Sequence, residues 1–111
     1  MGLDIWMQSK SCEKCGHQEN TEYFHCTYNL WPMWSSIYPE DEKLVDIDGL
    51  SGKKSLCKLT HAHTELTNYP DKFIAMNPSN NWGSYDVFLY FIEQLIDECE
   101  LHPDWVWCSW R

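Results

Sequence analysis

The chain has 111 residues, a formal net charge of −9 and only 8 lysine and arginine residues. This length fits a single domain, 1–111, whose core is close to the lower limit of what folds without further stabilisation. The acidic balance argues against a long nucleic acid as partner, because affinity for nucleic acids grows with the number of phosphates that the protein neutralises. No stretch approaches the roughly 20 apolar residues of a membrane span, so we expect no membrane partner either.

The chain holds 6 cysteines, which would suggest a disulfide scaffold if the protein were secreted. The first apolar residues alternate with polar ones and do not form the continuous run of a signal peptide. We therefore expect a soluble protein of the reducing cytoplasm, where cysteines bind metal or pack rather than form disulfides.

The first part of the chain has the pattern of a β-hairpin followed by an aromatic segment. Alternating apolar and polar residues predict strands at 3–8 and 23–28, and the segment 12–17 between them is a natural hairpin connection. Tryptophans interrupted by prolines follow at 30–43, where we expect one short helix and a loop.

The middle of the chain carries helical patterns. Apolar residues three and four apart predict a helix that begins near Ser51 and ends before Pro70. A short turn of helix is expected at 70–76. The strongest pattern predicts a helix at 85–101, with Ser84 as its N-cap.

The end of the chain has the composition of a strand. Pro103 stops the preceding helix, and 104–110 is rich in β-favouring residues. Together the elements predict an α+β fold, a small antiparallel sheet of about three strands with two or three helices packed on one side.

A metal site is the sharpest prediction of the sequence. Cys12 and Cys15, followed by Gly16, have the spacing of a zinc knuckle, in which two thiolates converge on one ion. Cys99 and His102 lie three residues apart at a predicted helix end, so both point to one face. We predict a structural zinc that staples the two ends of the chain through Cys12, Cys15, Cys99 and His102, against the alternative of packed thiols. Rival ligands are His17, the pair His25 and Cys26, and the pair His61 and His63.

The segment 77–86 is the predicted recognition loop. Asparagines and Trp82 stand immediately before a strong helix, so side-chain amides and backbone N–H groups converge there. The alternative is a loop that only caps the helix. The segment 29–34 adds an amide and aromatic rings, on which nucleobases stack. The ligand-binding residues predicted in these two segments are Asn29, Trp31, Trp34, Asn77, Asn80, Asn81, Trp82, Ser84 and Tyr85.

One basic spot stands out in the acidic chain. Lys53, Lys54 and Lys58 lie at the start of a predicted helix, where the pattern favours a solvated helix start and a phosphate contact is the secondary interpretation. On that interpretation Lys53 and Lys54 join the predicted ligand contacts. Cys57 and His61 are four residues apart, but no catalytic signature accompanies them, so an enzyme is not expected.

The opening MGLDIW, the CxxCGH knuckle and the segment NPSNNWGSY at 77–85 resemble a family of small phage and bacterial proteins whose function is uncharacterised. The resemblance spans nearly the whole chain and implies a phage origin and a host cytoplasm. The chain departs from the family pattern at Tyr28, where histidine is usual, and at Asn81, where glycine is usual. Asparagine replaces glycine best at positive φ, so Asn81 is expected in a left-handed turn.

The expected function is non-enzymatic binding of a small polar or nucleotide-like ligand between the two predicted segments. The phage resemblance implies sequestration of a nucleotide-type host immune signal, of the cyclic nucleotide or cyclic ADP-ribose class. The alternative is a zinc-stapled interaction module that inhibits a host protein through exposed tryptophans, because 7 tryptophans exceed what so small a core needs to bury. Either form can act as a homo-oligomer.

Overall fold

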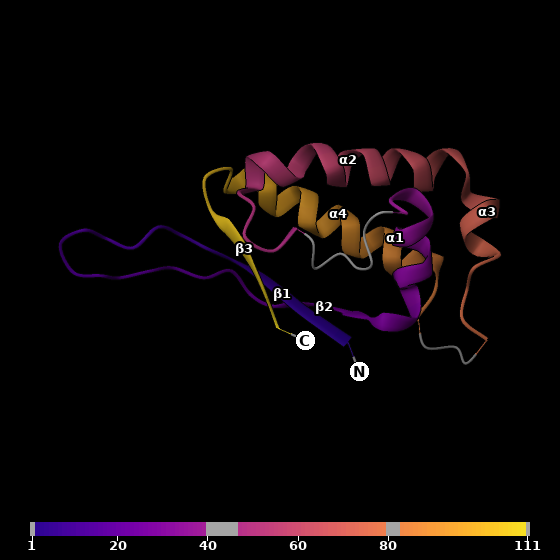
Figure 1. The fold of residues 1–111 in the computed structure, drawn as a ribbon, viewed down its shortest axis with the longest axis horizontal. Coiled ribbons are helices and arrows are strands. Elements are labelled where there is room, and N and C mark those ends of the chain that lie inside the picture. Colours follow the sequence, from indigo (N-terminus) through magenta and orange to yellow (C-terminus); the bar gives the residue numbers. More distant parts are fainter. Residues whose placement is uncertain (1, 40–46, 80–82, 111) are drawn as a thin grey trace.

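The computed structural model describes residues 2–39, 47–79 and 83–110, and it places helices on one side of a three-stranded sheet (Figure 1). This architecture confirms the predicted α+β class. The elements in chain order are β1 (Gly2–Gln8), β2 (Phe24–Thr27), a 3-10 turn (Tyr28–Leu30), α1 (Trp31–Ile37), α2 (Gly52–Asn68), α3 (Pro70–Ile74), α4 (Tyr85–Leu101) and β3 (Val106–Trp110).

The sheet has the order β2-β1-β3, and both pairings are antiparallel. Leu3 pairs with Cys26, and Met7 pairs with Trp107. All four side chains are buried, so the pairing register gathers the apolar side chains of the three strands on the face that the helices cover. The first and last strands are thus neighbours, joined by the backbone hydrogen bonds of the β1–β3 pairing.

The two long helices, α2 and α4, run antiparallel and side by side over the sheet (Figure 1). Both were predicted, and each turns one apolar stripe into the core. Leu59 and Leu66 of α2 and Ile92 and Leu95 of α4 are fully buried. Within the described segments, none of the helices combines the length and the apolar character that a membrane crossing requires.

Helix α1 is the short helix expected in the aromatic segment. Pro32 stands in its first turn, where a missing N–H costs no hydrogen bond. Trp31, Met33 and Trp34 of this helix are buried in the core. The remainder of the predicted segment, 40–43, lies outside the described residues.

The hairpin between β1 and β2 extends well beyond the sheet, and we call residues 9–23 the arm. The amide of Thr21 donates to Met7 O (3.0 Å), that of Ser9 to Glu19 O (2.9 Å) and that of Cys12 to His17 O (2.8 Å). Every residue from 10 to 20 is exposed. Figure 1 shows the arm reaching away from the helices along the longest dimension of the molecule, which measures 51 Å.

Candidate functional site

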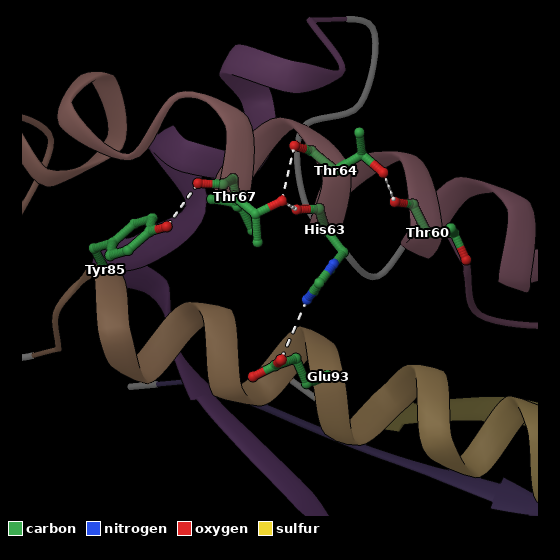
Figure 2. A network of polar contacts seen from close by, with 7 residues as sticks. Thr60, His63, Thr64, Thr67, Tyr85 and Glu93 are labelled. Atoms are coloured by element: carbon green, nitrogen blue, oxygen red, sulfur yellow. Dashed lines mark hydrogen bonds and ion pairs between the residues drawn. The ribbon is translucent and has the colours of Figure 1, made fainter.

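The described part of the predicted recognition loop is engaged in holding α4. Asn77 Oδ1 accepts the amide of Tyr85 at 2.7 Å, and Ser84 Oγ accepts the amide of Val87 at 3.4 Å. The Tyr85 hydroxyl donates to Leu66 O at 2.6 Å, so its ring reaches from α4 to α2 (Figure 2). These contacts support the capping alternative for Asn77, Ser84 and Tyr85.

The three other predicted residues of that loop, Asn80, Asn81 and Trp82, lie outside the described residues, and so does the expected left-handed turn at Asn81.

The cap gives a first testable prediction. Asn77→Ala should lower the free energy of unfolding by about 1 kcal/mol, because the amide of Tyr85 loses its side-chain acceptor. Chemical denaturation measures the change. The exposed Asn68 at the end of α2 is the matched control, and Asn68→Ala should change stability by less than about 0.5 kcal/mol. Equal stability of both variants would contradict a capping role for Asn77.

The aromatic half of the predicted site belongs to the core. Trp31 is 5% exposed and Trp34 is 0% exposed, so neither ring offers a face to a ligand in this structure. Trp31 instead meets the Phe88 ring edge-on, with 6.4 Å between centroids. Asn29 Nδ2 donates to Thr27 Oγ1 at 3.1 Å, an internal contact. The prediction that these residues stack on a ligand gains no support.

The start of α2 is closed to a phosphate on its backbone side. The amide of Gly52 donates to Trp105 O (2.8 Å) and that of Lys53 to Pro103 O (2.9 Å). The amide of Lys54 donates to Ser51 Oγ (3.1 Å). Because these amides already have acceptors, an anion near this helix end must be held by side chains rather than by the helix N-terminus.

Lys54 lines a cavity of about 690 Å³ between the end of α1 and the first turns of α2. We call this cavity the α1–α2 groove. Its α2 wall carries Lys54, Lys58 and His61, which recur at helical spacing on one face. The residues that line the groove are Ile37, Tyr38, Pro39, Lys54, Cys57, Lys58 and His61.

Tyr38 ties the two walls of the α1–α2 groove together. Its hydroxyl donates to Lys58 O at 2.9 Å, and the Lys58 ammonium lies 4.8 Å from the centroid of its ring. The His61 ring meets it edge-on at 5.7 Å between centroids. An aromatic ring and cationic side chains therefore face the same space.

A second cavity, of about 670 Å³, has the opposite character, and we call it the acidic groove. Figure 2 shows the His63 side chain of α2 directed at Glu93 of α4, with Nε2 3.2 Å from Oε2. The carboxylates that line this cavity are those of Glu22, Glu93, Asp97, Glu98 and Glu100. An anionic ligand would be repelled here, so charge alone distinguishes the two grooves.

The predicted metal ligands Cys12 and Cys15 lie at the tip of the arm, in the knuckle formed by residues 12–17. Gly16 has φ +73, a conformation that glycine adopts without strain, and its amide donates to Cys12 O at 2.7 Å. Backbone N–H groups of Cys15 and Lys14 hydrogen-bond the Cys12 sulfur, and they lower the pKa of that thiol. The turn thus favours a thiolate.

The other predicted ligands lie elsewhere. Cys99 is fully buried, with Sγ 3.4 Å from Ser55 Oγ, and burial raises the pKa of its thiol. His102 stacks on Trp105 at 3.8 Å between ring centroids. Across residues 2–39, 47–79 and 83–110, no three His, Cys, Asp or Glu side chains are grouped so that they could hold a metal ion. Zinc bound by Cys12, Cys15, Cys99 and His102 stays a prediction.

The rival metal ligands among the histidines and Cys26 make separate contacts as well. His25 Nδ1 lies 2.8 Å from Asp4 Oδ1, while burial raises the pKa of Cys26 to about 12. His61 lines the α1–α2 groove and His63 lines the acidic groove. The paired histidines therefore face different spaces, as their spacing on one helix requires.

Comparisons of the chain with models of protein families, with curated proteins and with solved structures gave no significant match. Its chemistry is therefore inferred from its own residues. Of these two grooves, the α1–α2 groove is the one that combines lysine side chains with an aromatic ring. Sequence reasoning identified Lys54 and Lys58 but assigned neither Tyr38 nor His61 to the ligand. The helical spacing of positions 54, 58 and 61 was the available signal.

Proposed function

We propose that this protein binds a small anionic ligand with a flat ring, of the nucleotide class, in the α1–α2 groove. The observation that carries the proposal is the position of Lys54, Lys58 and His61 on one wall of a cavity whose other wall presents the Tyr38 ring. In a chain with a net charge of −9, the two lysines of this wall are the natural place for a phosphate.

The dimensions of the groove suit such a ligand. Its volume of about 690 Å³ falls within the range of about 300–1,000 Å³ typical of small-molecule sites. Ammonium groups attract phosphate oxygens, and an aromatic side chain supplies a surface against which a base can stack. Ile37 and Pro39 add apolar surface at the α1 side. The ligand is then held both by charge and by ring contact within the same groove.

The proposal keeps the class of ligand expected from the sequence and assigns it different contacts. Of the predicted ligand residues, Lys54 lines the groove, and Lys53 is an exposed neighbour on the same helix turn. The family resemblance extends the class to cyclic nucleotides and cyclic ADP-ribose, which a phage protein would sequester from the host. Binding without chemical conversion is the proposed activity.

The second prediction tests this site by calorimetric titration with AMP. Lys54→Glu should weaken AMP binding at least about tenfold, or ~1.4 kcal/mol, because an attractive charge near the phosphate becomes a repulsive one. Lys72→Glu is the matched control, since Lys72 is an exposed lysine of α3 outside the groove and the change in net charge is the same. The control should bind as the unmodified protein does.

Adenosine separates the two parts of the proposed contact. Adenosine carries the ring without the phosphate, so it should bind the unmodified protein more weakly than AMP does. Its affinity should be the same for the unmodified protein and for Lys54→Glu. Equal weakening by Lys54→Glu and Lys72→Glu would indicate unspecific attraction and contradict the groove. Recovery of AMP unchanged after incubation is expected for a binding protein, whereas a new product would show an enzyme.

A second candidate function, the protein-interaction module, is favoured by the outer face of the sheet. Trp6 stacks on Tyr23 with 4.7 Å between ring centroids, and Tyr23 and Trp110 are 60% and 68% exposed. Trp6 pairs with Cys108, two residues from Trp110, so the aromatic side chains share one face. Exposed aromatic residues of this kind anchor protein interfaces. Failure of every nucleotide to bind would make this candidate the leading one.

A further inference from the structure

The arm is long, paired and without a core of its own. Its backbone hydrogen bonds continue from the sheet to the knuckle, yet every residue from 10 to 20 is exposed. An isolated two-stranded ribbon is marginally stable in water. An arm of this kind gains most from a cross-link at its tip, where the chain is farthest from the core.

The tip presents two exposed thiols with the sequence spacing of a zinc knuckle. Cys12 and Cys15 are both exposed free cysteines in a turn closed by the bonds Cys12 N to His17 O (2.8 Å) and Gly16 N to Cys12 O (2.7 Å). Zn²⁺ in a structural site takes four ligands in a tetrahedron, so one knuckle supplies half of a site.

The other half does not come from the described part of the same chain. No third His, Cys, Asp or Glu side chain of that part joins the two thiols in a group that could hold a metal ion. Cys99 of α4 is buried in the core, and His102 stacks on Trp105. Another molecule can bring the two missing ligands.

We propose that a second copy of this chain completes the site, so that one Zn²⁺ is bound by Cys12 and Cys15 of each of two arms. A two-fold axis through the ion makes the contact self-complementary, the commonest symmetry of protein dimers. Binding forms four Zn–S bonds and releases the thiol protons to solvent. The proposal is independent of the α1–α2 groove.

Two features of the chain favour a dimer contact between the arm tips over one between the parts of the molecule formed by the sheet and the helices. Each copy has a net charge of −9, so close approach of these parts is unfavourable, whereas arms along the 51 Å axis keep them apart (Figure 1). A zinc ion with four thiolates carries a charge of about −2. Lys10 and Lys14 are close to the two cysteines in the sequence, and the knuckle holds only one carboxylate, that of Glu13. The two lysines therefore offset the negative charge of the zinc site.

The third prediction is the stoichiometry of metal and chain. Reduced, metal-free protein is titrated with zinc sulfate, and zinc content and molar mass are measured by native mass spectrometry and by light scattering during gel filtration. We expect one zinc per two chains and a doubling of the 13.2 kDa mass, both reversed by EDTA. Co²⁺ in place of zinc should show the absorption of a tetrahedral four-thiolate site.

Variants identify the ligands. Cys12→Ser with Cys15→Ser should abolish both zinc binding and dimerisation and leave the unfolding temperature of the metal-free protein unchanged, since these side chains contact no core. Cys57→Ser with Cys108→Ser is the matched control and should retain both. One zinc per single chain, loss of zinc binding in His17→Ala or His102→Ala, or no zinc bound at all would each overturn the proposal.

Discussion

Gly52→Ala is expected to destabilise the protein by about 3 kcal/mol, even though alanine is the better helix former. Gly52 begins α2 and is buried, and a Cβ at this position would lie 2.6 Å from the carbonyl oxygen of His102. It would also lie 3.2 Å from Cys99 Cα and 3.0 Å from Met7 Cε. Because two of these atoms belong to the backbone, no change of side-chain conformation removes the overlap.

The neighbouring backbone is held on both sides, which makes this close approach rigid. The His102 carbonyl accepts the amide of Trp105 at 3.1 Å, and Gly52 itself donates to Trp105 O at 2.8 Å. Urea denaturation measures the expected loss. Lys53→Ala, one residue further along the same turn, is exposed and should change stability by less than about 0.5 kcal/mol. Equal stability of the two variants would mean that α2 can move away from the 102–105 turn.

The elements were predictable where one local signal dominated. The alternation of β1 and the apolar stripes of α2 and α4 each recur several times within one segment, so packing and propensity agree there. Pro103 separates α4 from β3, as expected. The helix within 30–43 was predicted despite two prolines, because Pro32 falls in the first turn, where proline is tolerated.

The candidate site was less predictable, because it depends on which segments meet. The ring of Trp34 is buried only because α1 lies against the core, and no local pattern separates such a ring from an exposed one. The segment that begins at Asn77 has the composition of a recognition loop, yet the side-chain oxygen of Asn77 accepts a hydrogen bond from the amide of Tyr85. Lys54 was recognised from charge, while the opposite wall of its groove, Tyr38, comes from another helix.

A buried polar contact between α2 and β3 gives the second of the large expected effects. The Trp107 indole N–H donates to Ser55 Oγ at 2.9 Å, and both side chains are fully buried. The Ser55 hydroxyl in turn donates to Ser51 O at 3.0 Å. Ser55→Ala should lower the free energy of unfolding by about 1–3 kcal/mol, because the indole N–H is left in the core without an acceptor.

The exposed face of the same helix supplies the matched control. Thr64 Oγ1 donates to Thr60 O at 3.0 Å (Figure 2), which is the same kind of bond to the preceding turn that Ser55 makes. Thr64→Ala should change stability by less than about 0.5 kcal/mol, because water replaces the lost bond. A large loss in both variants would point to the helix backbone rather than to the buried contact.

A double-mutant cycle with Trp107→Phe separates the hydrogen bond from the volume of the ring. Trp107→Phe removes the N–H and leaves Ser55 with its backbone acceptor, so its cost is mainly that of the smaller ring. In that background no donor is left unpaired, and Ser55→Ala should cost at least about 1 kcal/mol less than it does alone. Additive losses would show that Ser55 stabilises the protein through α2 itself. A coupling of the expected size would instead show that this contact holds β3 against the helices. The turn at 102–105, which precedes β3 and accepts the amides at the start of α2, would be held in place with it.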